Sequence, residues 1–246
     1  MKRTLLVIML TAAMCPGLLW AAPVSYMGKL AYGGTGADGT LIVNSVGPQA
    51  GWLSPITSVS WQVDNTTTPG LWHYEYTITV RDGGDLSTDI QCVILETSST
   101  FSWNDLDSVS STPADWIADV EIGSFSWSHN RNLPSSVYGV LFGTAVVDPT
   151  TLTIGFDSDR MPVWGDLYAR SFAVNGSYNT LANAGWESVI DDIDPTTPAS
   201  DGSILDHILV PDSVGTQDVE VPAPGAILLA TLGTSLAGWL RCRRWL

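Results

Sequence analysis

Residues 71–80, LWHYEYTITV, place an apolar side chain at every second position. The apolar set, which would share one face, is Trp72, Tyr74, Tyr76, Ile78 and Val80. A period of two is that of a β-strand with one face in a core and the other in solvent. The stretch therefore predicts a half-buried strand whose core face is aromatic, with His73 on the polar face.

Short β-rich runs of the same kind recur along the chain, and turn-forming residues separate them. The runs are 39–46, 58–63, 89–96, 120–127, 137–142, 151–156, 165–174 and 203–210. Turn sequences such as DNTTTPG, HNRNLP and DSDRMP lie between them, and long amphipathic helical repeats are absent from the sequence. About nine short strands in one block predict an all-β fold, a single antiparallel β-sandwich of jelly-roll kind.

Charge is distributed unevenly along the 246 residues. Residues 23–220 hold all 25 acidic residues but only five basic ones, which are Lys29, Arg81, Arg131, Arg160 and Arg170. This body therefore has a formal charge of −20, against −15 for the whole chain. Because so acidic a body repels phosphate backbones, we expect no nucleic-acid partner.

The first 22 residues have the layout of a secretory signal. MKRT is a positive start, LLVIMLTAAM is an apolar run, and WAA ends in the small residues that favour cleavage. We therefore expect residues 1–22 to be a signal peptide and the chain to be exported. Cys92 is then the one cysteine of the body, and its apolar surroundings in DIQCVILE predict a buried, inert thiol.

The other end of the chain predicts a membrane segment. Residues 225–240 contain no charge and would form a helix of about 24 Å, somewhat short of the roughly 30 Å of a bilayer core. Arg241, Arg243 and Arg244 follow at once, and basic residues stay on the cytoplasmic side, which leaves the body outside. A C-terminal core helix is the alternative, and the arginine cluster argues against it.

The link before this segment, VPAP, is extended because Pro222 and Pro224 disfavour helix at the residues before them. Motif, apolar span and arginine cluster together resemble the PEP-CTERM sorting signals of Gram-negative bacteria. Pro222 and Pro224 match the two prolines of that family, and Ala223 replaces its usual glutamate. The resemblance implies an exosortase-type membrane protease as partner and a place at the cell surface or in the extracellular matrix. A plain single-span anchor is the alternative.

These assignments divide the chain into four parts: the signal peptide 1–22, the β-sandwich ectodomain 23–210, a polar tether 211–220, and the sorting signal 221–246. The last comprises the motif 221–224, the transmembrane segment 225–240 and the basic tail 241–246. The body also resembles the uncharacterised β-sandwich ectodomains that precede PEP-CTERM tails, in YEYTITVRDGGDLS, GFDSDRMPVWGDLYAR and DGSILDHILVPD. That likeness implies a fold and no activity.

No motif in the sequence predicts catalysis. His73, His129 and His207 have no second histidine at a metal-ligand spacing, and the sequence lacks HExxH, CxxC and GxSxG. We therefore expect a protein that is not an enzyme. A secreted carbohydrate-active enzyme stays open as an alternative, because two facing carboxylates in a cleft would suffice for glycoside hydrolysis.

Acidic loops are the candidates for a metal. DSD supplies Asp157 and Asp159, and DDID supplies Asp191, Asp192 and Asp194. Ca²⁺ binds six to eight oxygen atoms, and loops of this kind provide them. None of them has the spacing of an EF-hand, so we expect solvated turns in the first place and a Ca²⁺ site only as the weaker alternative. No other cofactor is implied.

Tryptophans could supply a sugar-binding surface, because an indole face stacks on a sugar ring. Trp61, Trp72 and Trp127 fit the core faces of strands, whereas Trp103, Trp116, Trp164 and Trp186 lie near loops. Of the latter, Trp164 and Trp186 are the chosen candidates for sugar stacking. The sequence thus predicts a non-enzymatic surface or matrix protein, linked by the family resemblance to exopolysaccharide and biofilm, with a carbohydrate-binding module as the alternative.

Overall fold

The computed structural model describes residues 23–34, 38–48, 51–81, 89–144, 149–186 and 199–211. All of these belong to one compact unit, residues 23–216. The predicted signal peptide, the sorting signal and all of the tether except Pro211 lie outside the described residues. Within the described ranges, no helix has the length and apolar character needed to cross a membrane.

The described part of the chain is all-β, apart from a short 3₁₀ helix η2 (Trp103–Asp105). The strands are β1 (Ser25–Tyr32), β2 (Gly39–Val46), β3 (Ser58–Asp64), β4 (Trp72–Thr79), β5 (Ile90–Glu96), β6 (Asp107–Thr112), β7 (Asp119–Phe125), β8 (Val137–Gly143), β9 (Thr151–Ser158), β10 (Pro162–Gly165), β11 (Leu167–Ser171), β12 (Tyr178–Asn183) and β13 (Ile208–Pro211). The predicted all-β class is therefore confirmed.

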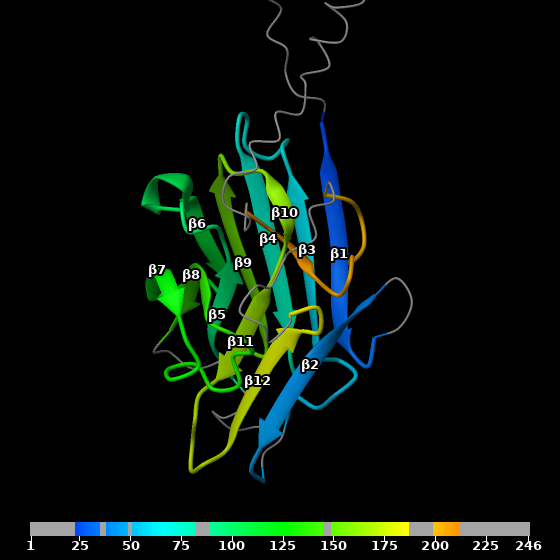
Figure 1. Ribbon diagram of the computed structural model, residues 1–246, viewed down its shortest axis with the longest axis vertical. Coiled ribbons are helices and arrows are strands. Elements are labelled where there is room, and N and C mark those ends of the chain that lie inside the picture. The colour runs from blue at the N-terminus through cyan, green and yellow to red at the C-terminus, as the bar shows by residue number, and fades with distance from the viewer. Residues whose placement is uncertain are drawn as a thin grey trace, which may run out of the picture. The chain divides into compact units, whose positions relative to one another are not determined.

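Eleven of these strands form one sheet in the order β6-β9-β4-β3-β1-β2-β12-β11-β5-β8-β7. Neighbouring strands pair antiparallel, except β1 and β2, which pair in parallel over the short stretch Leu30–Tyr32. Figure 1 shows β1, β3, β4 and β9 running side by side, with β2, β11 and β12 crossing them at an angle. The sheet thus curls at the β1–β2 pair into two halves.

The inner faces of the two halves enclose the main core. In β4 the expected alternation is present: Tyr74, Tyr76 and Ile78 are buried, and Trp72 is half-buried. Phe156 of β9 stacks on Tyr74 at 5.2 Å and on Tyr76 at 6.1 Å between ring centroids. A body without a disulfide is therefore held by an aromatic interior, whose burial supplies the main stabilising free energy.

A two-stranded ribbon, β10 paired with β13, completes this core. Trp164 of β10 and Leu209 of β13 are fully buried, and β13 lies against β1, β3 and β5. The hydroxyl of Tyr76 donates a hydrogen bond of 2.7 Å to the carbonyl of Leu209, which ties the ribbon to β4. Strands from both halves of the sheet therefore contact the last described segment.

The loop before β13 protects the edge that β1 leaves open beyond its pairing with β2. Gly202 N–H donates to Met27 O at 2.7 Å, and Met27 N–H donates to the Asp201 carboxylate at 3.0 Å. This close approach requires glycine at position 28, since a Cβ there would lie 2.2 Å from Trp61 Cζ2 and 2.5 Å from Gly202 O. Unpaired strand edges invite association with other chains, and this loop covers one of them.

A smaller apolar cluster lies outside the second half of the sheet. Its buried members are Ile94, Phe125, Leu133, Val137, Tyr168, Ala182 and Trp186. The cluster is covered by the loop between β7 and β8, residues 126–136, which we call the β7–β8 loop. Leu133 is the apolar residue that this loop contributes to the cluster.

Candidate functional site

The structure tests the predicted site residues unequally. The sorting motif Pro222, Ala223 and Pro224, the basic tail residues Arg241, Arg243 and Arg244, and the acidic residues Asp191, Asp192 and Asp194 lie outside the described residues. Asp157, Asp159, Trp164 and Trp186 lie within them.

Asp157 and Asp159 are not placed to share a cation through free oxygens. Asp157 is buried, with Oδ1 2.7 Å from His73 Nδ1 and Oδ2 accepting a hydrogen bond of 2.8 Å from the Thr68 hydroxyl. Asp159 is exposed. Both oxygens of Asp157 are thus engaged by protein groups, and in the described ranges no group of three or more His, Cys, Asp or Glu side chains is arranged to hold a metal.

His73 is half-buried rather than exposed, which corrects the sequence-based expectation. Residues directly opposite each other in neighbouring antiparallel strands share a face, and His73 pairs with Asp64 of β3 and with Asp157 of β9. The loop between β3 and β4 folds over this row, because Thr66 and Thr67 bind Asp64 and Thr68 binds Asp157. The row therefore anchors the loop between β3 and β4.

The pKa of Asp64 reflects this role. Burial alone would raise the pKa of the carboxyl, but four hydrogen bonds outweigh that effect and hold the pKa below its ordinary value. They come from the backbone N–H and side-chain hydroxyl groups of Thr66 and Thr67, at 2.7 to 3.0 Å. Hydrogen bonds to the charged form favour it, so Asp64 is an ionised anchor.

A second His–Asp pair lies deeper. His207 Nδ1 is 3.0 Å from Asp166 Oδ1, with both side chains buried, and Asn183 Nδ2 donates to the same oxygen at 2.5 Å. Asp166 Oδ2 is buried and has no hydrogen-bond partner among the described residues. With so little exposure, the pair has no room for a substrate. It joins the segment before β13 to the β10–β11 and β12 strand ends.

Trp164 and Trp186 cannot stack on a sugar, which corrects that prediction. The exposed fraction is 0% for Trp164 and 5% for Trp186. Trp164 lies inside β10 rather than in a loop, edge-on to Trp61, and the Trp186 indole N–H donates to the Ser135 hydroxyl at 2.8 Å. Both residues contribute to the core.

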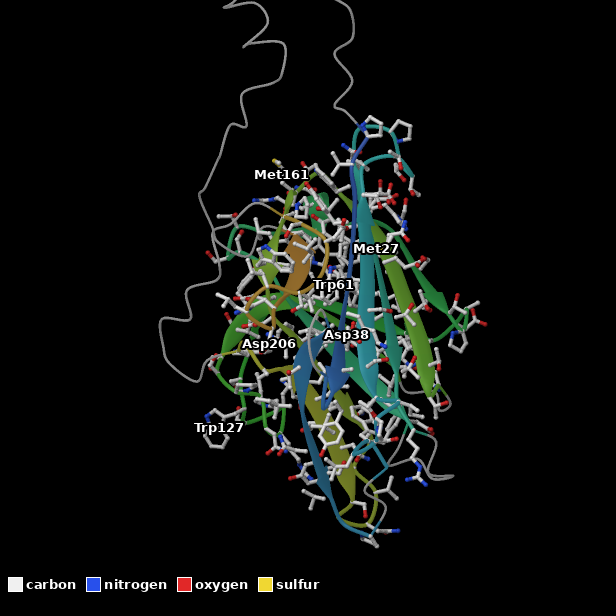
Figure 2. The ribbon with its side chains drawn as sticks, turned by 90° about the vertical axis from the view of Figure 1, so that its right-hand side faces the viewer. Met27, Asp38, Trp61, Trp127, Met161 and Asp206 are labelled. Carbon is white, nitrogen blue, oxygen red and sulfur yellow. The ribbon has the colours of Figure 1, made fainter. Side chains whose placement is uncertain are left out.

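Trp127 departs from its prediction in the opposite direction, because it is exposed where burial was expected. The sequence predicts it on a core face, but β7 ends at Phe125 and the Trp127 side chain is 73% exposed. Figure 2 shows it projecting from the body, whereas Trp61 lies among interior side chains. Trp103, at 59%, is the other exposed tryptophan of the described ranges.

The β7–β8 loop that carries Trp127 is anchored at several points. The Asn130 backbone and side chain both donate to Ser126 O, and Asn132 Nδ2 donates to the Thr180 hydroxyl at 3.2 Å. Tyr168 donates its hydroxyl to Arg131 O at 2.5 Å. Because burial raises the pKa of Tyr168 well above its usual value, that donor stays protonated. These hydrogen bonds therefore hold the β7–β8 loop in place against the body.

Two arginines lie on the outer face of β11 and β12, beside the β7–β8 loop. The Arg131 guanidinium carbon lies 4.8 Å from the centroid of the Tyr178 ring, which is a cation–π contact. Arg170 Nε donates to Cys92 Sγ at 3.1 Å and covers that thiol. Cys92 is buried as predicted; burial raises its pKa, and Arg170 opposes that rise in part.

The sequence analysis missed this arginine pair as a feature. Its signal was the scarcity of bases: five in a body of charge −20, one of them within the turn sequence HNRNLP. The pairing of β11 with β12, which sets Arg170 opposite Thr180, could not be read from the sequence. Comparisons of the chain with protein-family models, curated proteins and solved structures found no match.

Proposed function

We propose that this protein is exported and held at the surface or in the extracellular matrix of a Gram-negative bacterium, where it displays an acidic, non-enzymatic β-sandwich. The observation that carries the proposal is the C-terminal sequence: VPAP, sixteen uncharged residues, then Arg241, Arg243 and Arg244. A positive N-terminus followed by an apolar run supports export. The protein would be a substrate of an exosortase-type protease.

The folded body suits display. Its two apolar clusters are formed by residues of the chain itself within 23–211, and its single described cysteine is buried and free, so these clusters are closed without a disulfide. We infer that the curled sheet is a β-sandwich of jelly-roll kind, with the parallel β1–β2 pair as its departure from an antiparallel pattern. A role in biofilm matrix follows from the family resemblance.

Deletion of residues 225–246 tests the proposal in a Gram-negative host that has an exosortase. We expect the full chain to fractionate with the cell surface and the truncated chain to appear in the periplasm or medium. Substitution of Arg241, Arg243 and Arg244 by glutamine is the matched variant, since it keeps the span and removes the charge that orients it. Unchanged surface retention of the truncated chain would refute the sorting role.

A second candidate function is carbohydrate binding by the body. One observation favours it: Trp127 is exposed at 73% on a loop that is anchored by hydrogen bonds. Aromatic side chains held rigidly at a surface are suited to stack on sugar rings. Binding of the protein to a glycan array, abolished by Trp127→Ala and kept by Trp103→Ala, would support this function; no binding to any glycan would remove it.

A further inference from the structure

We propose that the outer face of β11 and β12, at Arg131, Arg170 and Tyr178, binds a carboxylated polysaccharide. The proposal rests on the carbohydrate-binding candidate above and deepens it, because it names the class of glycan and the residues that select it.

Arg131 and Arg170 are positive groups on a strongly acidic body. Of the five basic residues in the body, Lys29 lies 3.9 Å from Asp38, and Arg160 lies 3.1 Å from Asp105. Arg81, Arg131 and Arg170 have no ion pair with a carboxylate within the described ranges of the chain, and of these three Arg131 and Arg170 lie over the outer face of β11 and β12. In a body of charge −20, two such guanidinium groups on one face are a local exception. In the described sheet rows that pass through Arg170 and Tyr168, the acidic residues are Asp119 and Glu121 on β7, three strands from β11, or about 14 Å away.

The side chains of Arg131 and Arg170 lie over the same outer face of β11 and β12. Arg170 is directly opposite Thr180 across the β11–β12 pair, so the two side chains share a face. Tyr178, under Arg131, is two residues before Thr180 on the same face, about 7 Å away along the strand. Asn132, next to Arg131, donates to the Thr180 hydroxyl. The Arg131 guanidinium therefore lies over Tyr178 of β12, and the Arg170 side chain extends from the same face of β11 beside Thr180, with its Nε directed at Cys92 of β5.

A contact within the protein holds each of the two guanidinium groups. Arg131 stacks over the Tyr178 ring, and a stacked guanidinium keeps its N–H donors free in its own plane. Arg170 uses Nε on the Cys92 sulfur. In the described ranges its terminal nitrogens have no carboxylate acceptor. Both groups thus offer donors that suit the two oxygens of a carboxylate, and they are ordered before a ligand arrives.

The occupant follows from these steps. Charge complementarity requires an anion, and the two sets of donors come from separate elements, the β7–β8 loop and β11, which suits an extended chain that contacts both. Nucleic acid and anionic membrane are both opposed by the repulsion between their dense charge and a body of −20. A polysaccharide with a carboxylate on its sugar units presents a lower charge density, and its rings can stack on Trp127 of the adjacent loop.

Affinity electrophoresis of the full chain in detergent micelles tests the proposal, with polygalacturonate, neutral dextran and mixed micelles that contain phosphatidylglycerol as probes. We expect binding to polygalacturonate that weakens at least tenfold in the Arg131→Gln/Arg170→Gln variant. Raising the ionic strength from about 0.05 to about 0.5 M should also weaken it, because salt screens exposed charges. Lys29→Gln/Arg81→Gln, which also removes two positive charges, is the matched control for charge, and Trp103→Ala is the matched control for Trp127→Ala.

Four results would overturn the proposal. Equal binding by the Arg131→Gln/Arg170→Gln and Lys29→Gln/Arg81→Gln variants would show that overall charge, not this face, matters. Binding to dextran as strong as to polygalacturonate would keep carbohydrate binding and remove the selection of carboxylates. Arginine-dependent binding to the phosphatidylglycerol micelles alone would assign the face to a lipid surface. Binding to no probe would remove both the site and the carbohydrate-binding candidate. Thermal unfolding of each variant, measured in parallel, identifies any loss of binding that comes from misfolding. If the Arg131→Gln/Arg170→Gln variant misfolds, the single variants Arg131→Lys and Arg170→Lys test the same site with less disruption of the fold.

Discussion

Phe142 of β8 stacks on Phe156 of β9, with ring centroids 5.8 Å apart and planes at 25°. The two strands follow each other in the sequence but lie at opposite ends of the eleven-stranded sheet, tenth and second in its order. They can touch only because the sheet curls until its halves face each other. The contact therefore reports on the closure of the sheet and not on the pairing of neighbouring strands.

Phe142→Ala should lower the free energy of unfolding by about 3–5 kcal/mol, because a fully buried ring is lost and a cavity remains. Urea unfolding followed by tryptophan fluorescence measures the change. Trp127→Ala removes an exposed aromatic ring and should change the stability by less than about 0.5 kcal/mol. Equal losses in the two variants would contradict the facing arrangement of the halves.

Gly123 and Gly139 face each other across the β7–β8 pair and form a natural comparison. A Cβ at Gly139 would lie 2.1 Å from the carbonyl oxygen of Leu95, whereas one at Gly123 would meet nothing within 4 Å. Gly139→Ala should therefore cost about 1–3 kcal/mol through overpacking, and Gly123→Ala should be near neutral. Thermal unfolding of the two variants checks this, and a Gly139→Ala variant as stable as the Gly123→Ala one would show that β5 and β8 do not approach as closely as described.

His207 Nδ1 lies 3.0 Å from Asp166 Oδ1 in the interior, and we expect the two side chains to stabilise each other. Removing one partner of a buried pair leaves the other uncompensated, so His207→Ala should cost about 3–5 kcal/mol. His129→Ala, which alters an exposed turn, should have little effect. The double variant Asp166→Asn/His207→Gln should be more stable than His207→Ala, because it removes the buried charge as well. If the double variant is the less stable one, the pair does not act through charge.

Asp64 should make stability depend on pH. Its pKa is lowered in the folded protein, so its ionised form stabilises the fold above the unfolded pKa of about 3.9. That contribution is lost as the pH falls through the lower, folded value. Asp64→Asn should cost about 1–3 kcal/mol at pH 7, and this difference from the wild type should shrink below pH of about 4. Urea titrations at several pH values measure it; a difference that stays constant down to pH of about 2 would contradict the assignment, and Asp115→Asn, an exposed change, serves as the control.

Much of the fold is readable in the sequence where alternation is strong. Residues 39–46 and 58–63 match β2 and β3, and residues 71–80 contain β4. β1 was missed because Gly28 and Lys29 interrupt its apolar pattern, and β12, YNTLAN, because its buried Asn179 and Asn183 are poor strand formers. These asparagines are buried because they bind backbone groups: Asn179 accepts from Trp52 N–H and Asn183 from Leu167 N–H. Such long-range partners leave no local signal.

The candidate site was less predictable for the same reason. An indole near a loop can end in a core, as Trp164 does, or outside it, as Trp127 does, and the choice depends on where a strand stops. The contact of Arg131 with Tyr178 joins residues 47 positions apart. Composition indicated that bases are scarce, but only the register of β11 with β12 brings two of them to one face.

The central claim is that the acidic body stands outside the cell. Antibody labelling of unbroken cells tests it, with an epitope inserted between Asn175 and Gly176, two exposed residues in the tight turn between β11 and β12. The account predicts labelling of intact cells that express the full chain, at a level that permeabilisation does not raise. Labelling that requires permeabilised cells would contradict it.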